Sequence, residues 1–254
     1  MSFPEYLFLI GGKDLEMEAI SQLLADNHLQ VADHNLQWGA KLSSYQALFN
    51  DNQTFVGIEL IEDIARPKHY IEIDHHNENS HKRSSLEQVI ARLEEDLNLK
   101  IDFTRDLQLI AANDSGYIPA MLDIGATPDE VSDIRRRDRK AQGVTPEDEL
   151  WAEQSIHENL TIEGGITIVK SLTHHFSAVT DRLYPYERLL IYTDNELNYY
   201  GKGVPKLIAA FDDLIQQQKA YSGGGGNFFG IGFNSLPTKE LIKAKDTIIS
   251  ILTD

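Results

Sequence analysis

The chain contains no cysteine. This absence excludes a disulfide framework, a cysteine-based zinc site and a thiol nucleophile. It also lacks an apolar run close to the length of a membrane span. Its first residues, Met1 to Tyr6, have neither the basic region nor the long apolar region of a signal peptide. We therefore expect a cytoplasmic protein that does not associate with membranes.

Basic residues are scarce, with 23 Lys and Arg against 40 Asp and Glu, and the net charge is −17. The phosphate backbone of a long duplex would be repelled by such a protein, so broad nucleic-acid binding is not expected. A small phosphorylated substrate remains compatible, because a bound metal ion or a local basic patch can reverse the field inside a cleft. The basic run 135–140 is either a helix face balanced by nearby acids or a patch that faces phosphate.

The first half of the chain predicts an α/β fold. Short apolar runs typical of buried strands alternate with stretches of helical spacing, and such alternation favours a mostly parallel, doubly wound sheet. The expected strands are 6–10, 54–60 and 70–73, and the expected helices are 14–24 and 86–97, the second capped by Ser84 or Ser85.

The second half predicts helices followed by a smaller α/β domain. Thr127-Pro128 and Thr145-Pro146 each have the cap and the first-turn proline of a helix start. Strands are then expected at 166–169, 188–192 and 197–200, and helices at 176–183 and 204–215. We therefore expect a domain over 1–126, a helical bridge over 127–163 and a second domain over 164–254.

The tripeptide Asp74-His75-His76 follows the strand expected at 70–73. Neutral imidazole suits transition metals such as manganese, iron and zinc, and a carboxylate broadens the site toward Mn²⁺ and Mg²⁺. In a parallel sheet, ligands bind at the carboxyl ends of the strands. The tripeptide is therefore a candidate metal site, provided that other ligands lie nearby.

Four carboxylates follow apolar segments in the same half of the chain: Asp14, Glu16, Glu59 and Asp114. Each alone has an ordinary interpretation, as a helix cap or as a solvated residue at the end of a strand. A carboxylate that ends a buried run is costly unless it is paired or binds a metal. Their joint occurrence predicts a metal centre at the ends of the sheet.

A glycine run, Gly223-Gly224-Gly225-Gly226, precedes Asn227 in the second half. Consecutive glycines permit close backbone approach to a ligand, and their amides can form an anion-binding nest. The alternative is a plain hairpin or a surface loop.

With these motifs in place, the chain resembles the DHH phosphoesterase superfamily over nearly its whole length. That group includes RecJ-type exonucleases, nanoRNases, cyclic-dinucleotide phosphodiesterases and family II inorganic pyrophosphatases. The resemblance rests on Asp14-Leu15-Glu16, Glu59, the namesake Asp74-His75-His76, Asp114 within Asn113–Gly116, and the glycine run ending in Asn227.

The resemblance implies hydrolysis of a small phosphorylated substrate, such as a short oligonucleotide or a cyclic dinucleotide, by metal-activated water. The cofactor would be Mn²⁺ or Mg²⁺, and the catalytic motif Asp74-His75-His76. The implied metal ligands are Asp14, Glu16, Glu59, Asp74, His75 and Asp114, and the implied substrate-binding residues are His76, Arg83, Gly223, Gly224, Gly225, Gly226 and Asn227.

The chain also departs from the family pattern. The usual first-motif histidine is missing from Ile10-Gly11-Gly12-Lys13, Glu16 and Glu59 stand where aspartates are usual, and Asn227 replaces a histidine. Two hypotheses therefore stay open. The protein is a metal-dependent phosphohydrolase, or it is a catalytically weakened relative that binds nucleotide as a sensor or as a subunit of a complex. Its expected partners also include a second copy of the chain, in a homodimer.

Overall fold

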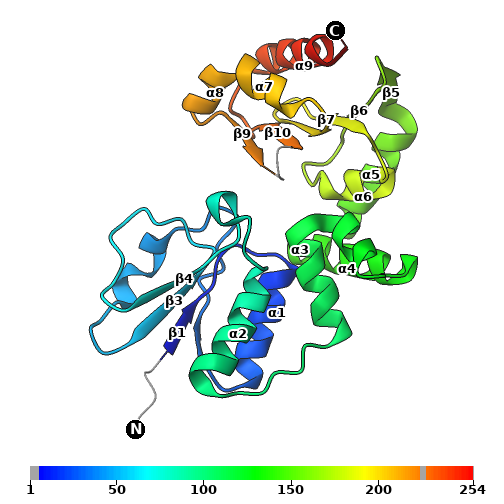
Figure 1. The fold of residues 1–254 in the computed structure, drawn as a ribbon. Helices are drawn as coiled ribbons and strands as arrows, with labels where there is room; N and C mark the ends of the chain where they lie inside the picture. Colours follow the sequence, from blue (N-terminus) through cyan, green and yellow to red (C-terminus); the bar gives the residue numbers. More distant parts are fainter. Residues whose placement is uncertain (1–5, 224–226, 254) are drawn as a thin grey trace. The chain divides into compact units, whose positions relative to one another are not determined.

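The chain divides between Gly143 and Val144 into two units, each built around its own sheet. The computed structural model describes residues 6–223 and 227–253 (Figure 1). Helix α4 (Pro128–Ala141) belongs to the first unit and α5 (Pro146–Asn159) to the second. The two helices expected to form a bridge therefore fall in different units.

The first unit contains a fully parallel sheet with the strand order β2-β1-β3-β4. The strands are β1 (Tyr6–Leu9), β2 (Gln30–Ala32), β3 (Thr54–Ile58) and β4 (Tyr70–Ile73). The predicted parallel α/β sheet is confirmed, although β2 was not expected. From β1 the chain first adds a strand on one side and then two on the other, which makes the carboxyl ends of β1 and β3 the switch point where such sheets bind ligands.

The two faces of this sheet are covered differently. Helices α1 (Leu15–Asp26) and α2 (Ser85–Leu97) lie side by side along one face (Figure 1). On the other face the 3₁₀ segment η1 (Leu42–Leu48) packs Leu42 and Tyr45 against Leu9 and Phe55, all fully buried. A doubly wound sheet has α-helices on both faces, so this part of the prediction is met on one face only.

Helix starts follow the capping residues of the sequence. Ser84 caps α2 in a capping box with Glu87, which decides between the two serines considered. Thr127 and Thr145 form the same box at α4 and α5. Each box satisfies two backbone N–H donors at the start of the helix, which fixes where the helix begins.

Helix α3 (Arg105–Asp123) connects α2 to α4 and carries a kink. Gly116 and Tyr117 leave the helical conformation, with Tyr117 at φ 59° and ψ −149°. A non-glycine residue in this region is strained and persists only when its surroundings hold it. The kink begins at Gly116, two residues after Asp114.

The second unit contains a mixed six-stranded sheet of order β5-β6-β7-β8-β10-β9, in which β6 and β7 pair in parallel. Helices α7 and α9 cover one face, and α5 and α6 cover the other. The helix expected over 204–215 is divided at Phe211 into α7 and α8. The elements are β5 (Leu160–Glu163), β6 (Ile166–Lys170), α6 (Ser177–Leu183), β7 (Arg188–Tyr192), β8 (Leu197–Gly201), α7 (Val204–Ala210), α8 (Asp212–Gln216), β9 (Ala220–Gly223), β10 (Phe228–Ile231) and α9 (Thr238–Thr253).

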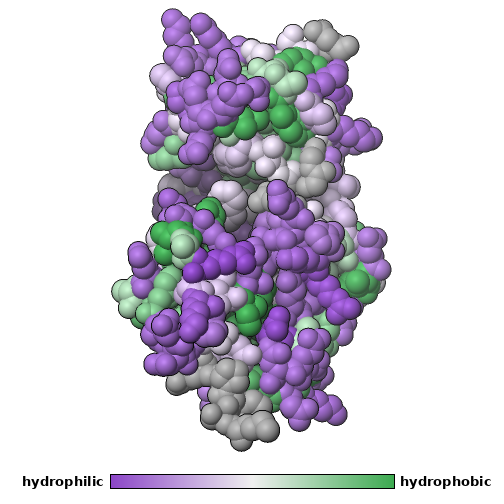
Figure 2. Space-filling view, turned by 60° about the vertical axis from the view of Figure 1, so that its left-hand side comes forward, coloured by the Kyte–Doolittle hydropathy of each residue, from purple (hydrophilic) through white to green (hydrophobic). Residues whose placement is uncertain are grey.

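The surface drawn in Figure 2 is mostly hydrophilic, with hydrophobic residues gathered in small separate areas. Within residues 6–223 and 227–253, no helix combines the length and the apolar character needed to cross a bilayer.

Candidate metal centre

Four side chains of the first unit converge at the carboxyl ends of the sheet. Glu16 extends from α1, Glu59 follows β3, His75 follows β4 and Asp114 lies on α3. One ligand atom from each lies within 4.8 Å of the others. Glu59 and His75 also form a second such group with His76. Both groups share two residues, so they describe one cluster.

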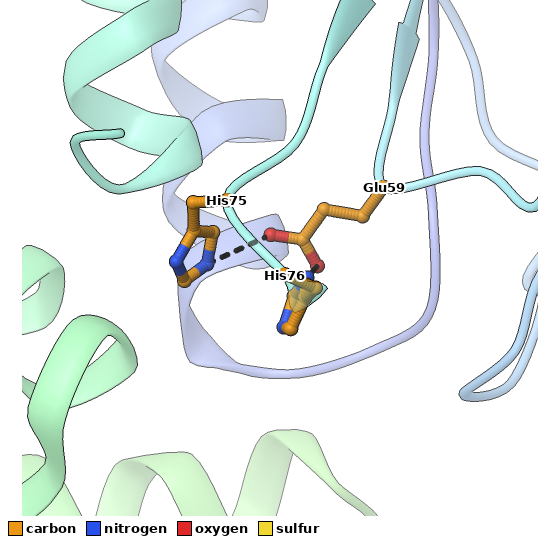
Figure 3. A group of neighbouring side chains, drawn as sticks. All are labelled: Glu59, His75 and His76. Carbon is orange, nitrogen blue, oxygen red and sulfur yellow. Dashed lines mark ion pairs between the residues drawn. The ribbon is translucent and has the colours of Figure 1, made fainter. Parts of the chain in front are cut away.

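The imidazole of His75 is the centre of this cluster. Its Nε2 lies 2.6 Å from Asp114 Oδ2 and 3.3 Å from Glu59 Oε1. Figure 3 shows the Glu59 carboxylate between the two imidazoles, with its second oxygen, Oε2, 4.0 Å from His76 Nδ1. Three carboxylates and an imidazole therefore surround a single small volume.

The backbone at the end of β3 aims Glu59 into the cluster. Glu59 has φ 52°, a left-handed conformation that is uncommon outside glycine. The end of β1 passes close by, since a Cβ placed on Gly11 would lie 2.5 Å from the Ile58 carbonyl oxygen. Gly11 is therefore required where the chain leaves β1 and passes the end of β3, and as a glycine it supplies no side-chain ligand.

The N-terminus of α2 holds two of the carboxylates. Ser85 Oγ donates to Glu59 Oε1 at 2.7 Å, and the Leu86 amide donates to Glu16 Oε1 at 3.0 Å. Amides at a helix N-terminus favour negative charge. The sequence pattern indicated Ser85 only as a possible helix cap. Nothing in the residues around Ser85 indicates its contact with Glu59.

Buried atoms of the cluster lack hydrogen-bond partners of their own. Glu16 Oε2, His75 Nε2 and Asp114 Oδ2 are all buried, and apart from the 2.6 Å approach of the last two to each other they have no hydrogen-bond partner. Such atoms are costly unless another group satisfies them. A divalent cation would do so, and a set of three carboxylates and one imidazole suits ions such as Mn²⁺. The residues present therefore fit a metal.

Two of the predicted ligands lie outside both groups. Asp14 caps α1 by accepting a hydrogen bond from the Met17 amide at 2.8 Å. Asp74 accepts hydrogen bonds from the His76 amide and from Asn79 Nδ2, each at 3.0 Å. Burial acts to raise the pKa of Asp74, but the hydrogen bonds from Asn79 and His76 outweigh it and lower that pKa. Asp74 therefore stays ionised and orients His76, whose Nδ1 lies 2.9 Å from it.

Asp114 lies on a different kind of element from the one expected. We expected it to end an apolar run at the edge of the sheet, but it lies inside α3. The segment 105–123 mixes apolar, charged, glycine and proline residues, which conceals the helix from periodicity.

The predicted substrate-binding residues are spread over both units. His76 and Arg83 are exposed in the first unit. In the second unit, Gly223 pairs with Phe228 across an antiparallel hairpin, and Asn227 is an exposed turn residue. Gly224, Gly225 and Gly226 lie outside the described residues.

The basic run 135–140 is largely balanced by acids. Arg135 is buried and pairs with Asp138 at 2.6 Å. Arg136 pairs with Asp133, and Arg137 with Asp106 and Asp133. These pairs favour the balanced helix over a patch that faces phosphate.

The crowded carboxylates shift the protonation equilibria of the cluster. Burial, together with the charges of Asp114 and Glu59, raises the pKa of Asp14 and that of Glu16 well above their usual range. Burial alone would lower the pKa of His75, but Asp114 and Glu59 outweigh it and raise that pKa to about 11. In the absence of metal, protons therefore take the place of a cation.

This protonation predicts a pH-dependent effect of Mn²⁺ on stability. Without metal, the folded protein binds more protons than the unfolded chain. The extra protons are held by Asp14 and Glu16 at pH values above the ordinary pKa of a carboxyl, and by His75 between pH 6.5 and about pH 11. Its stability should therefore fall as pH rises through these ranges. Mn²⁺ must displace the protons, so it should raise the Tm more at about pH 9 than at about pH 6.

Differential scanning fluorimetry with Mn²⁺ or EDTA measures the difference. Calorimetric titration in buffers of different ionisation enthalpy should show that protons are released as Mn²⁺ binds. A Tm increase that is equal at both pH values, without proton release, would contradict the assignment.

Comparison with known proteins identifies the fold. No family model matches the chain, and no curated protein sequence matches it. Among solved structures, the chain is similar to a DHH-domain protein described as a member of the s1p family of ribosomal proteins, with a TM-score of 0.54, 12% identity, and coverage of 97% of this chain and 86% of that one. The chain has the fold of that DHH domain.

A second solved structure is also similar, the pGpG-specific phosphodiesterase PggH from Vibrio cholerae. The TM-score is 0.46 at 11% identity, with 99% of each chain covered. The cluster of Glu16, Glu59, His75 and Asp114 lies beside the end of β4, where Asp74-His75-His76 follows that strand.

Proposed function

We propose that the protein is a metal-dependent phosphoesterase that hydrolyses a small phosphorylated substrate, such as a short oligonucleotide or a cyclic dinucleotide. The observation that carries the proposal is the convergence of Glu16, Glu59, His75 and Asp114 on one point, with buried oxygen and nitrogen atoms that lack other partners. The DHH-type fold supports the same reaction class. The net charge of −17 favours a small substrate over a long duplex.

The metal that we propose is Mn²⁺, held by one imidazole and three carboxylates. When bound, a divalent cation supplies Lewis-acid activation of water and stabilises charge on phosphoryl oxygens. The chain contributes the ligands and fixes their orientation, through Ser85 for Glu59 and the Leu86 amide for Glu16. Interactions of this kind orient metal ligands and tune their basicity.

His76 is the residue that we place against the substrate. Its side chain is 45% exposed, beside the buried His75. Asp74 occupies its Nδ1, so Nε2 is the ring nitrogen that would meet a phosphate oxygen or give a proton to the leaving group. An ionised aspartate fixes both the orientation of the ring and its tautomer.

A second candidate is a weakened relative that binds nucleotide without turnover. Two observations favour it. Gly11 is packed against β3 where the family pattern has a ligand nearby, and Asp14 and Asp74 are engaged outside the cluster. The remaining donors suffice for one ion, whereas a two-metal site needs ligands for a second ion about 3.5–4 Å away.

A substrate panel separates the two candidates. The purified protein is incubated with Mn²⁺ and with dinucleotides, cyclic dinucleotides, pyrophosphate or a model phosphodiester, and products are resolved by chromatography. We expect hydrolysis of at least one diester, lost in EDTA and restored by excess Mn²⁺. Nucleotide binding detected by calorimetry, without turnover of any member of the panel, would support the second candidate and contradict the first.

A further inference from the structure

A buried polar network lies beside the metal centre in the first unit. It consists of Asn113 on α3 and of Arg135 and Asp138 on α4, each less than 8% exposed. Arg135 Nη1 donates to Asp138 Oδ2 at 2.6 Å and to Asn113 Oδ1 at 2.9 Å. A buried guanidinium is tolerated only when it is paired in this way. Arg135 thus differs from Arg136 and Arg137, whose pairs with Asp133 and Asp106 are more exposed.

The network reaches the backbone that carries Glu16. Asp138 Oδ1 accepts a hydrogen bond from the Leu15 amide at 3.3 Å. Leu15 is the first residue of α1, and it lies between the cap Asp14 and the ligand Glu16. Asp138 is held in turn by Arg135 and by Gln142 Nε2 at 3.0 Å. The start of α1 is therefore tied to α4 through this carboxylate.

The same guanidinium contacts α3 on both sides of Asp114. It donates a hydrogen bond to Asn113, the residue before Asp114. Its carbon Cζ lies 4.5 Å from the centre of the ring of Tyr117, three residues after Asp114. Tyr117 is the residue with the strained backbone at the kink. A cation placed over an aromatic ring is attracted to it, so Arg135 helps to hold the kinked conformation.

We propose that Arg135 is a positioning residue for the metal centre. Through Asp138 it fixes the segment of Glu16, and through Asn113 and Tyr117 it fixes the segment of Asp114. Two ligands more than 90 positions apart in the sequence are thereby held at the spacing that a metal ion requires. The proposal rests on the proposed function, since it presumes that the centre binds Mn²⁺. Polar contacts behind metal ligands commonly govern affinity.

Four variants test the proposal. Arg135→Lys keeps the charge but loses the planar fork that contacts Asp138, Asn113 and the ring together. Arg135→Met removes the charge, and Asp138→Asn weakens the link to α1. The matched control is Arg136→Gln on the same helix, because Arg136 is 61% exposed and pairs only with Asp133 among the described contacts.

Mn²⁺ affinity and the spectrum of the bound ion are measured by electron paramagnetic resonance, and folding without metal by circular dichroism. We expect Arg135→Lys and Asp138→Asn to bind Mn²⁺ about 10–100-fold more weakly. The spectrum of the bound ion should also change, because the ligand geometry does. The control should stay within about twofold of the wild-type affinity.

The outcomes separate the two proposals. If the wild type binds Mn²⁺ and the folded variants Arg135→Lys and Asp138→Asn bind it with unchanged affinity and spectrum, the positioning role is wrong while the metal centre stands. A lower Tm with an unchanged spectrum would show that the network is merely structural. A wild-type protein that binds no Mn²⁺ overturns both proposals. Unfolding of Arg135→Met alone leaves the decision to the two milder variants.

Discussion

Replacement of His75 by alanine is expected to lower the Mn²⁺ affinity by more than about 100-fold and to abolish Mn²⁺-dependent hydrolysis. His75 Nε2 lies close to both Asp114 and Glu59, and it is buried with no other partner among the described residues. Losing a ligand should cost more than the 10–100-fold typical of groups that only support ligands.

Isothermal titration with Mn²⁺ and product analysis on the diester panel measure both effects. His81→Ala is the matched control, because His81 is an exposed histidine whose ring contacts only the Glu78 carbonyl oxygen among the described contacts. If His75→Ala bound Mn²⁺ as tightly as His81→Ala, the metal centre would not be at this cluster.

Replacement of Glu16 by glutamine is expected to act in opposite directions on stability and on metal binding. Glu16 is 1% exposed, and its Oε2 has no hydrogen-bond partner. A glutamine keeps the acceptor for the Leu86 amide and places an amide group near the Asp114 carboxylate, which it can donate to. Without metal, the variant should therefore be more stable by roughly 1–2 kcal/mol near neutral pH.

The same change removes one of the three carboxylates from the centre. We expect the Mn²⁺ affinity of Glu16→Gln to fall by more than about 100-fold, so that Mn²⁺ no longer raises its Tm appreciably. Denaturant unfolding in EDTA measures the stability without metal, and unfolding in Mn²⁺ measures how much the ion stabilises the same protein. Glu18→Gln, at an exposed position of the same helix, should change neither quantity. A Glu16→Gln protein that is less stable in EDTA would contradict the raised pKa of Glu16, because protonating that carboxyl near neutral pH costs the folded protein free energy.

Local sequence patterns predicted the elements whose information lies within a few residues. The strand at Tyr70–Ile73 and the helix starts at Ser84, Thr127 and Thr145 agree with the structure, because alternating or apolar runs and capping boxes are local. The parallel sheet then follows from the alternation of strands and helices. The acids after β1, β3 and β4 were predicted for the same reason.

Contacts between distant segments could not be predicted in this way. Asp114 comes from a helix kinked at Tyr117, whose ring lies against Arg135, 18 residues later in the chain. In the sequence, Arg135 is one of several arginines in a charged helix, and nothing local separates the buried one from its exposed neighbours. Strand β2 has only three residues and its pairing with β1 defines it, so its composition gave no signal.

The inclusion of α4 in the first unit has a consequence for how the proposed metal ion would be acquired. The ligands begin at Glu16, but the carboxylate that ties the start of α1 to the network is Asp138. A chain that stopped at residue 126 would contain every ligand and still lack that tie. During synthesis, the ligand pocket would therefore become complete only after α4 has left the ribosome, so ion capture would follow the folding of the whole unit rather than nucleate it.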